Sequence, residues 1–151
     1  MDISSSDQNI FATGGCDAAS RIWDRRVGKT VRIFYGHTGD VAALSFFPDG
    51  NAIASGSDDS SARLFDIRAD GQIACYTQDN AAGVTSLSHT KSGAFLFVGY
   101  DDNKFCQWDV RSGERTAIVV AHDERISALA VAPDGSALCT ASWDSIVKIW
   151  N

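Results

Sequence analysis

The chain has 151 residues with 44% hydrophobic and 21% charged content, and its formal net charge is −6. The acidic balance argues against a nucleic-acid-binding surface, which needs a basic stripe, and no apolar run approaches the ~18 residues of a membrane span. The N-terminus lacks the basic and apolar regions of a secretory signal, so the sequence predicts a globular protein of the cytoplasm.

The first nine residues are expected to be frayed. Asp2, Ser4 and Ser6 stand where an innermost strand would begin, and such polar residues form buried strands poorly. The first reliable strand is therefore predicted to start near Ile10.

From that point the chain repeats itself. Four times an aspartate is followed six residues later by an aromatic anchor, and the anchors are 42, 43 and 42 residues apart. A period of this length, closed by Trp-Asp, is typical of propeller blades built from four strands. The pairs are Asp17 with Trp23, Asp59 with Phe65, Asp102 with Trp108, and Asp144 with Trp150. We call these four aspartates the marker aspartates. The repeats thus end near residues 24, 66, 109 and 151.

Each repeat is expected to contribute up to four strands, because apolar residues alternate between turns that keep a glycine. The innermost strands are predicted at 41–46, 84–87 and 126–131, the second at 53–57, 95–99 and 138–142, the third at 63–65, 105–108 and 147–150, and the fourth at 31–34, 73–76 and 116–120. The fold class is therefore all-β, a partial β-propeller of about three and a half four-stranded blades. The open faces of its first and last blades are expected to favour self-association.

The cysteines and paired carboxylates do not form a metal-binding pattern. Cys16, Cys75, Cys106 and Cys139 are 59, 31 and 33 residues apart, which is not the spacing of a zinc or redox site. They are predicted to be small buried hydrophobes in a reducing compartment. Adjacent aspartates at 58–59 and 101–102 could bind a metal, but neighbouring side chains point in different directions. We expect no metal and no cofactor.

Two repeats carry histidine, hydroxyl, aspartate and aromatic residues at matched positions. A Ser-His-Asp set could form a hydrolase triad, which is recognised by geometry rather than by sequence order. A structural role is favoured instead, because active sites are usually single and a satisfied buried network makes a fold rigid. The two sets are His37, Ser55, Asp59 and Phe65, and His122, Thr140, Asp144 and Trp150.

The network is predicted to be weaker where the chain departs from this pattern. Phe65 has no N–H, Asn80 replaces the histidine of the third repeat, and Val98 replaces its hydroxyl. Only the last repeat holds all four members, so loss of Asp144 is expected to damage folding more than loss of Asp59. His89, which replaces an apolar residue of an inner strand, is expected to be a packed core histidine.

The remaining candidate chemistry lies on the surface. Residues that open the inner strands and residues of the turns before the third strands are expected to lie on one face, around the central channel. They include Asp40, Ala42, Arg125, Asp58, Tyr100, Asp101 and Trp143. An exposed Trp143 beside carboxylates is typical of a protein-binding hot spot; the alternative is a Trp that only caps the blade edge.

Several runs of the chain resemble the beta subunit of heterotrimeric G proteins. They lie at residues 33–48, 56–70, 91–93, 99–102 and 142–151, and the likeness extends from about residue 10 to 151. The resemblance implies the C-terminal half of a seven-bladed propeller that acts as a non-enzymatic scaffold. Such a protein takes part in G-protein-coupled signal transduction at the cytoplasmic face of the plasma membrane. It binds an alpha subunit, a gamma subunit and effectors, with no nucleic acid and no insertion into the membrane.

The resemblance also implies which residues meet these partners. Asp40, Asp58 and Trp143 match positions that contact the alpha subunit, His122 and Arg125 lie near positions used by effectors, and Ala42 stands where the family has asparagine. Tyr100 and Asp101 are placed on the same face. The surface for the gamma subunit would comprise Phe47, Pro48, Asp49, Asn51, Asp66, Arg68 and Asp70.

Two alternatives to a G-protein beta function remain open from the sequence. The chain could be a Trp-Asp repeat adaptor for another protein partner, or a truncated fragment without function.

Overall fold

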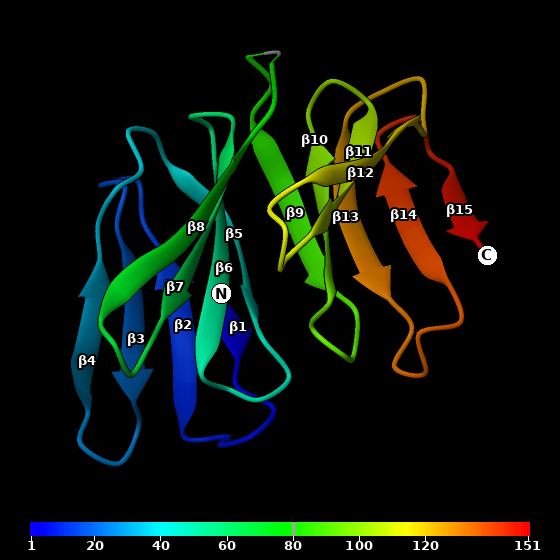
Figure 1. Ribbon diagram of the computed structural model, residues 1–151. Coiled ribbons are helices and arrows are strands. Elements are labelled where there is room, and N and C mark those ends of the chain that lie inside the picture. Colours follow the sequence, from blue (N-terminus) through cyan, green and yellow to red (C-terminus); the bar gives the residue numbers. More distant parts are fainter. Residues whose placement is uncertain (80) are drawn as a thin grey trace.

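The computed structural model describes residues 1–79 and 81–151, which form fifteen strands in four antiparallel sheets (Figure 1). Asn80, the residue expected at the histidine position of the third repeat, lies outside the described residues. The described residues contain no helix, and so none long and apolar enough to cross a membrane. The predicted all-β fold of a partial propeller is confirmed.

Each sheet is built from consecutive strands of the chain. The first contains β1 (Asp2–Ile3), β2 (Ile10–Gly14), β3 (Ser20–Asp24) and β4 (Lys29–Phe34), and the second contains β5 (Val41–Phe46), β6 (Ala52–Ser57), β7 (Ser61–Asp66) and β8 (Gly71–Thr77). The third contains β9 (Val84–His89), β10 (Phe95–Tyr100), β11 (Lys104–Asp109) and β12 (Arg115–Val120), and the fourth contains β13 (Ile126–Val131), β14 (Leu138–Ser142) and β15 (Val147–Trp150).

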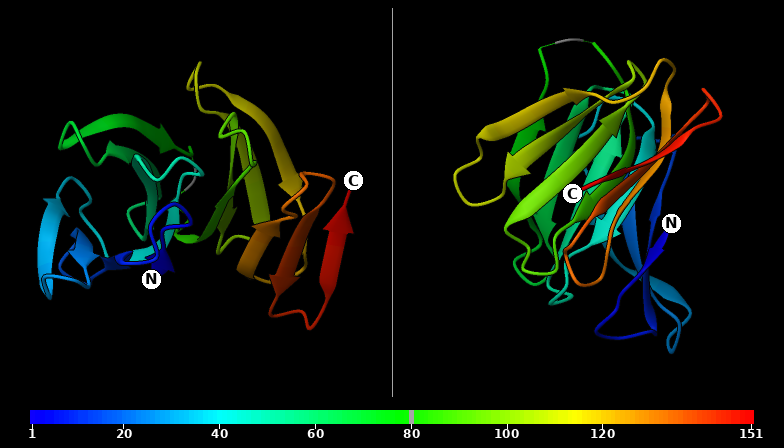
Figure 2. Two further views of the ribbon diagram at one scale, coloured as in Figure 1. Left: turned by 90° about the horizontal axis from the view of Figure 1, so that it is seen from below. Right: turned by 90° about the vertical axis from the view of Figure 1, so that its right-hand side faces the viewer.

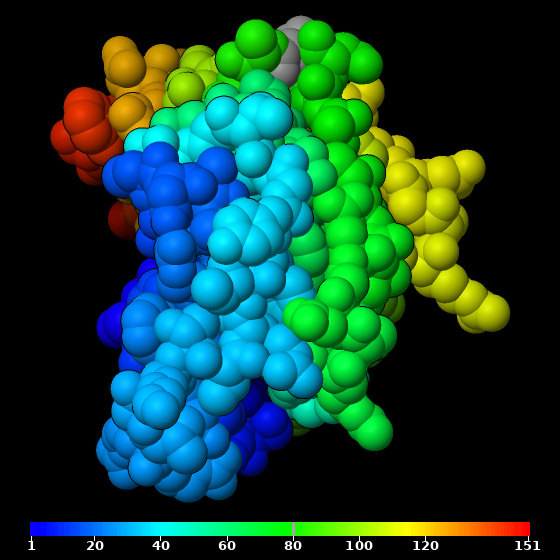
Figure 3. Space-filling model, turned by 90° about the vertical axis from the view of Figure 1, so that its left-hand side faces the viewer, coloured from blue at the N-terminus to red at the C-terminus, as the bar shows by residue number. Residues whose placement is uncertain are grey.

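The four sheets lie side by side in chain order (Figure 2). Their innermost strands are neighbours, because β1 contacts β5, β5 contacts β9, and β9 contacts β13. The hairpin of β11 and β12, yellow in Figure 3, projects beyond the surface of the first two sheets. Connections between sheets therefore run from an outermost strand back to the next innermost one, as in a propeller.

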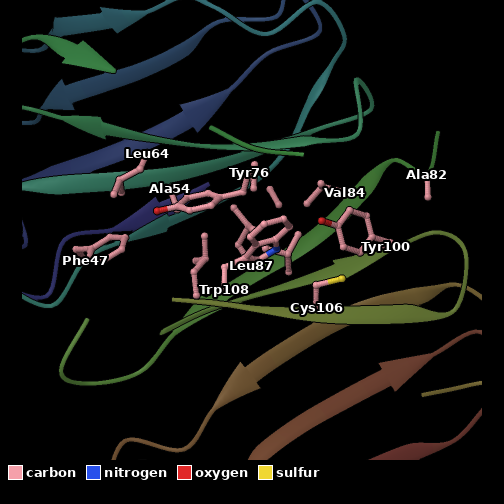
Figure 4. Close-up of a cluster of buried hydrophobic side chains, with 14 residues drawn as sticks. Phe47, Ala54, Leu64, Tyr76, Ala82, Val84, Leu87, Tyr100, Cys106 and Trp108 are labelled. Atoms are coloured by element: carbon pink, nitrogen blue, oxygen red, sulfur yellow. The ribbon is translucent and has the colours of Figure 1, made fainter. Parts of the chain in front are cut away.

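The core consists of three apolar clusters, each between two neighbouring sheets. In the cluster between the first and second sheets, Phe34 stacks on Phe65 with ring centroids 4.9 Å apart. The cluster between the second and third sheets is the largest and includes Tyr76 and Trp108 (Figure 4). The second and third sheets supply apolar residues to a cluster on each face, and the first and fourth sheets to one cluster each, so neighbouring sheets stabilise one another by burying shared surface.

A glycine in the second strand lets neighbouring sheets approach closely. A Cβ atom on Gly56 would lie 2.3 Å from a methyl carbon of Val84, and one on Gly14 would lie 2.5 Å from the carbonyl oxygen of Val41. Gly99 occupies the matched position of the third sheet, three residues before its marker aspartate. This recurring glycine is a signal of sheet contact that the sequence analysis did not use.

The expectation that residues 1–9 are frayed is wrong for residues 2–4. Asp2 and Ile3 form β1, which pairs with Ala12 and Phe11 of β2. Ser4 is 2% exposed, and its backbone N–H donates to the carbonyl oxygen of Ile10 at 2.9 Å. A polar segment can be buried here because its polar atoms have partners: the carboxylate of Asp2 accepts a hydrogen bond from the backbone of the neighbouring sheet.

Two cysteines and one histidine are less buried than the sequence pattern predicted. Cys106 is buried as expected, but Cys16 lies exposed in the turn after β2 and Cys75 is exposed on the outer strand β8. A strand at the outer edge of a sheet has no neighbour over part of its surface, so the apolar character of Cys75 does not bury it. His89 is only half-buried, and its ring packs on Phe47 with centroids 5.0 Å apart.

The burial of side chains between the sheets predicts how much stability is lost when one of them is shortened to alanine. Leu96 is 0% exposed in the largest cluster, so Leu96→Ala should lower the free energy of unfolding by about 2–5 kcal/mol. Ile118→Ala is the matched control, because Ile118 is 50% exposed on β12 and should cost under about 1 kcal/mol. Urea unfolding would measure both; equal losses would contradict the assignment of the core to the space between sheets.

Candidate functional site

In the second sheet, His37 joins an aspartate and a hydroxyl from two other segments. Its Nδ1–H donates to Oδ2 of Asp59 at 2.9 Å, and its Nε2 accepts from the hydroxyl of Ser55 at 2.7 Å. This tautomer follows because an ionised carboxylate can only accept. Asp59 accepts three further bonds, from the backbone N–H of Thr38 at 2.9 Å and from the N–H and hydroxyl of Ser61 at 3.0 and 2.6 Å. The segment before β5 is thereby tied to β6 and β7.

The fourth sheet repeats this arrangement and extends it by one member. The Nδ1–H of His122 donates to Asp144 at 2.8 Å, and its Nε2 accepts from the hydroxyl of Thr140 at 2.8 Å. The indole N–H of Trp150 donates to the same Thr140 oxygen at 2.9 Å. In the second sheet the anchor is Phe65, which has no donor, so the chain of hydrogen bonds ends at Ser55.

The turn that carries each marker aspartate also has a common backbone conformation. The next residue has a left-handed φ in all four repeats: 61° at Ala18, 66° at Ser60, 64° at Asn103 and 67° at Ser145. Non-glycine residues adopt this conformation only where their surroundings hold it. The aspartate side chain supplies such a hold, because Asp59 and Asp144 each accept from the backbone two residues on.

The Ser55, His37 and Asp59 distances are those of a catalytic triad, but the set is enclosed. Ser55 is 0% exposed and His37 is 8% exposed, so the hydroxyl cannot reach a substrate in solution. Burial is the main cause that lowers the pKa of His37, which keeps the ring neutral and suited to accept from Ser55. The fourth sheet contains the same buried set with Thr140 in place of serine, so in both sheets this hydrogen-bonded set has a structural role.

The first and third sheets depart from the pattern in different ways. In the first, the indole N–H of Trp23 donates to the hydroxyl of Thr13 at 2.8 Å, which keeps the outer half of the chain of bonds. In the third, Val98 is buried where a hydroxyl would stand. The indole nitrogen of Trp108 and the hydroxyl of Tyr100 are both buried and have no hydrogen-bond partner among the described residues.

At one end of the sheets, one backbone hydrogen bond recurs and sets pairs of surface residues side by side. The N–H of Asp58 donates to the carbonyl oxygen of Asp40 at 3.0 Å, that of Asp101 to Gly83 at 3.0 Å, and that of Trp143 to Arg125 at 3.1 Å. Each bond joins the turn before a third strand to the start of an inner strand. We call the exposed residues of this end the rim: Asp40, Ala42, Asp58, Asp101, Arg125 and Trp143.

The rim is continuous from the second sheet to the third. A Cβ atom on Gly83 would lie 3.1 Å from a carboxylate oxygen of Asp58 and 3.3 Å from one of Asp101, so the two carboxylates flank this glycine. At the fourth sheet the rim changes character, because Trp143 is 68% exposed and the guanidinium of Arg125 lies 4.9 Å from the centre of its ring. The rim therefore offers an acidic part and an aromatic, cationic part.

Three residues expected on interaction surfaces are buried here, so the expectation that they are exposed is corrected. Tyr100 is 0% exposed and points into the cluster between the second and third sheets (Figure 4), where burial raises the pKa of its hydroxyl. A register shift between Gly99 and Tyr100 occurs at this point of the β9–β10 pairing. His122 is 3% exposed, and both of its ring nitrogens are hydrogen-bonded. Phe47 is 8% exposed and belongs to the same cluster as Tyr100.

The other residues expected to meet a gamma subunit lie together at the opposite end of the second sheet. Pro48, Asp49 and Asn51 belong to the β5–β6 connection, Asp66 is the last residue of β7, and Arg68 and Asp70 belong to the β7–β8 connection. The two connections are neighbours, because the backbone N–H of Ile67 donates to the carbonyl oxygen of Asn51 at 2.8 Å. Asp49, Arg68 and Asp70 are exposed, while Pro48, Asn51 and Asp66 are partly buried.

The comparisons with known proteins agree with one another. All of residues 1–151 match the sequence profile of a family described as G protein beta WD-40 repeat protein. The chain is 44% identical over 159 aligned residues to guanine nucleotide-binding protein subunit beta-1 of Nicotiana tabacum, 44% to subunit beta of Solanum tuberosum, and 45% to subunit beta of Arabidopsis thaliana. Each alignment covers 99% of this chain and 42% of the relative, so the chain spans about two fifths of these proteins.

The hydrogen bonds reverse the expected order of two aspartate substitutions. Asp59 accepts four bonds, whereas Asp144 accepts three, from His122 and from the backbones of Asp123 and Ile146. Asp59→Ala should therefore lower stability more, by about 1–3 kcal/mol for each buried group left unpaired. Urea midpoints of the two alanine variants would decide, and a larger loss for Asp144→Ala would show that the count of bonds is not what matters.

Acid should weaken the fold through Asp59. Burial alone would raise the pKa of this carboxyl, but hydrogen bonds from Ser61, Thr38 and His37 outweigh it and lower the pKa from 3.8 to about 2. The unfolded chain then takes up the proton first, so the stability due to Asp59 is present above pH 3.8 and is lost as the pH falls towards about 2.

Asp59→Asn should therefore reduce the slope of the urea midpoint against pH between these values. Asp58→Asn, which changes the adjacent exposed carboxylate, is the control and should leave the slope close to that of the unchanged chain. An unaltered slope in Asp59→Asn would contradict the role given to these hydrogen bonds.

Proposed function

The chain belongs to the family of G protein beta WD-40 repeat proteins, and from this premise we propose that its rim is a protein-docking surface in G-protein signal transduction. The proposal rests on one observation. The residues that recur between repeats, His37 and His122 with their partners, are buried, whereas the residues that differ between repeats are exposed on the rim. Repeated buried residues stabilise each blade, and the non-repeated exposed ones are free to recognise a partner.

The partner proposed for the rim is a G-protein alpha subunit, or an effector that uses the same surface. Asp40, Asp58 and Asp101 present three carboxylates along the second and third sheets. A partner with lysine or arginine side chains would complement this part of the rim, and such complementarity mainly sets orientation and association rate. Trp143 would supply the apolar contact, since exposed tryptophan is enriched among residues that dominate binding energy.

A gamma subunit is proposed for the opposite end of the second sheet. The two neighbouring connections there carry Asp49, Arg68 and Asp70 as exposed charged groups. They lie on a different end of the molecule from the rim, so a gamma subunit and an alpha subunit could bind at the same time. In this arrangement the chain would reach the cytoplasmic face of the plasma membrane through its partners.

The function proposed is that of a scaffold without catalysis. The Ser55, His37 and Asp59 set is enclosed, and among the described residues no group of three or more histidine, cysteine, aspartate or glutamate side chains could hold a metal. Recognition of partners at the two ends of the sheets needs neither an accessible catalytic triad nor a metal ion.

Substitution of Trp143 tests the proposed rim. Trp143→Ala should weaken binding of a GDP-loaded alpha subunit by about 2 kcal/mol or more, measured by calorimetry. The melting temperature should change little, because Trp143 is 68% exposed in a turn outside the core clusters. Tyr35→Ala is the matched control, since Tyr35 is 70% exposed and follows β4 of the first sheet, which carries none of the rim residues. Unchanged affinity of a folded Trp143→Ala variant would remove Trp143 from the site.

A further inference from the structure

The aromatic part of the rim has a local arrangement that the other sheets lack. At the matched positions, the second sheet pairs Asp40 with Asp58 and the third pairs Gly83 with Asp101. Two carboxylates repel each other and glycine has no side chain, so neither pair can hold itself in place. Only Arg125 and Trp143 attract one another, and the repeat pattern does not require them.

The backbone beneath this pair is held by three hydrogen bonds between the loop before β13 and the turn between β14 and β15. The N–H of Trp143 donates to the carbonyl oxygen of Arg125 at 3.1 Å, and the hydroxyl of Ser142 donates to that of Glu124 at 3.0 Å. The N–H of Asp123 donates to the carboxylate of Asp144 at 3.2 Å. The backbone positions of Arg125 and Trp143 are therefore fixed, and only the rotamers of the two side chains remain to be determined.

The side chains themselves have few other restraints. Trp143 is 68% exposed, and no hydrogen bond of its indole N–H is seen in residues 1–79 and 81–151, unlike those of Trp23 and Trp150. Within the same residues, the guanidinium of Arg125 makes no salt bridge and no hydrogen bond, whereas Arg21 and Lys104 are paired with aspartates. The contact at 4.9 Å between the guanidinium and the indole ring is thus the restraint that each provides for the other.

We propose that Arg125 is a positioning residue, which holds the indole of Trp143 against the rim in the orientation used for docking. The proposal rests on the proposed function of the rim. A solvent-exposed tryptophan on a turn loses rotamer freedom when a partner binds, and this loss reduces affinity. An arginine stacked on one face of the ring removes part of that freedom beforehand and leaves the other face available to the partner.

The first test observes the indole without any partner. In the chain labelled with 5-fluorotryptophan, Trp143→Phe assigns the fluorine signal of Trp143 among the four tryptophans. Arg125→Gln should move this signal towards its position in the unfolded chain, and Arg125→Lys should move it less, because lysine keeps the charge. Arg111→Gln, with the same change of charge in the turn between β11 and β12, is the control and should leave the signal in place. An unmoved signal in Arg125→Gln would overturn the proposal.

The second test measures affinity for a GDP-loaded alpha subunit as the probe. Arg125→Gln should weaken binding roughly 2- to 5-fold, the range expected for an exposed cation–π contact. In the Trp143→Ala background the same substitution should have no further effect. If the loss persists there, Arg125 contacts the partner directly and the positioning role is wrong.

The two tests also separate this inference from the proposed function. If Trp143→Ala leaves affinity unchanged while Arg125→Gln still moves the fluorine signal, Arg125 orders the indole but the rim is not the docking surface. If Trp143→Ala weakens binding while Arg125→Gln changes neither the signal nor the affinity, the rim stands and the positioning role fails.

Discussion

Burial of apolar surface between neighbouring sheets is the constraint on which the rest of the structure depends. Each cluster draws its side chains from two sheets, as where Phe34 packs on Phe65 or Phe105 on Trp150. A four-stranded sheet with apolar residues on both faces cannot bury them alone, so each repeat is stable only beside another. The sheets approach so closely at Gly56 and Val84 that a residue with a side chain would not fit in place of the glycine.

The polar networks act within this frame. Burial between sheets would leave His37 and His122 desolvated, and their paired aspartate and hydroxyl partners offset that cost. In return the network ties the segment before each inner strand to the second and third strands. The marker aspartate also stabilises the turn between the second and third strands by accepting from the backbone two residues later. The backbone of this turn then holds the rim residues in place. The exposed surface is thus positioned by hydrogen bonds that are themselves largely buried.

This arrangement accounts for a division between stability and recognition. The matched histidines and hydroxyls of the second and fourth sheets are buried and serve the blade. The rim differs among the second, third and fourth sheets: two carboxylates, a glycine beside a carboxylate, then arginine on tryptophan. Because the scaffold beneath is constant, the rim can change its chemistry without changing its geometry. A protein-binding scaffold of the G-protein beta type is consistent with such a surface.

The sequence by itself determined the class of fold, the number of repeats, and the histidine, hydroxyl and aspartate that form the two matched networks. Those features follow from local alternation and a fixed period, which depend on residues close in the chain or at equal spacing. Which side chains are exposed was decided only by the tertiary structure. Tyr100 and Phe47 look like surface residues of turns and strand ends, yet the adjacent sheet covers both. β1 forms although it begins with a charged residue, because the backbone N–H of Phe46 donates to the carboxylate of Asp2. Arg125 meets Trp143 because a backbone bond joins segments 18 residues apart. Contacts between sheets join residues far apart in the chain and, apart from the recurring glycine of the second strand, leave no mark on local spacing. This is the physical reason that the pattern predicts the blades better than it predicts which of their side chains are covered.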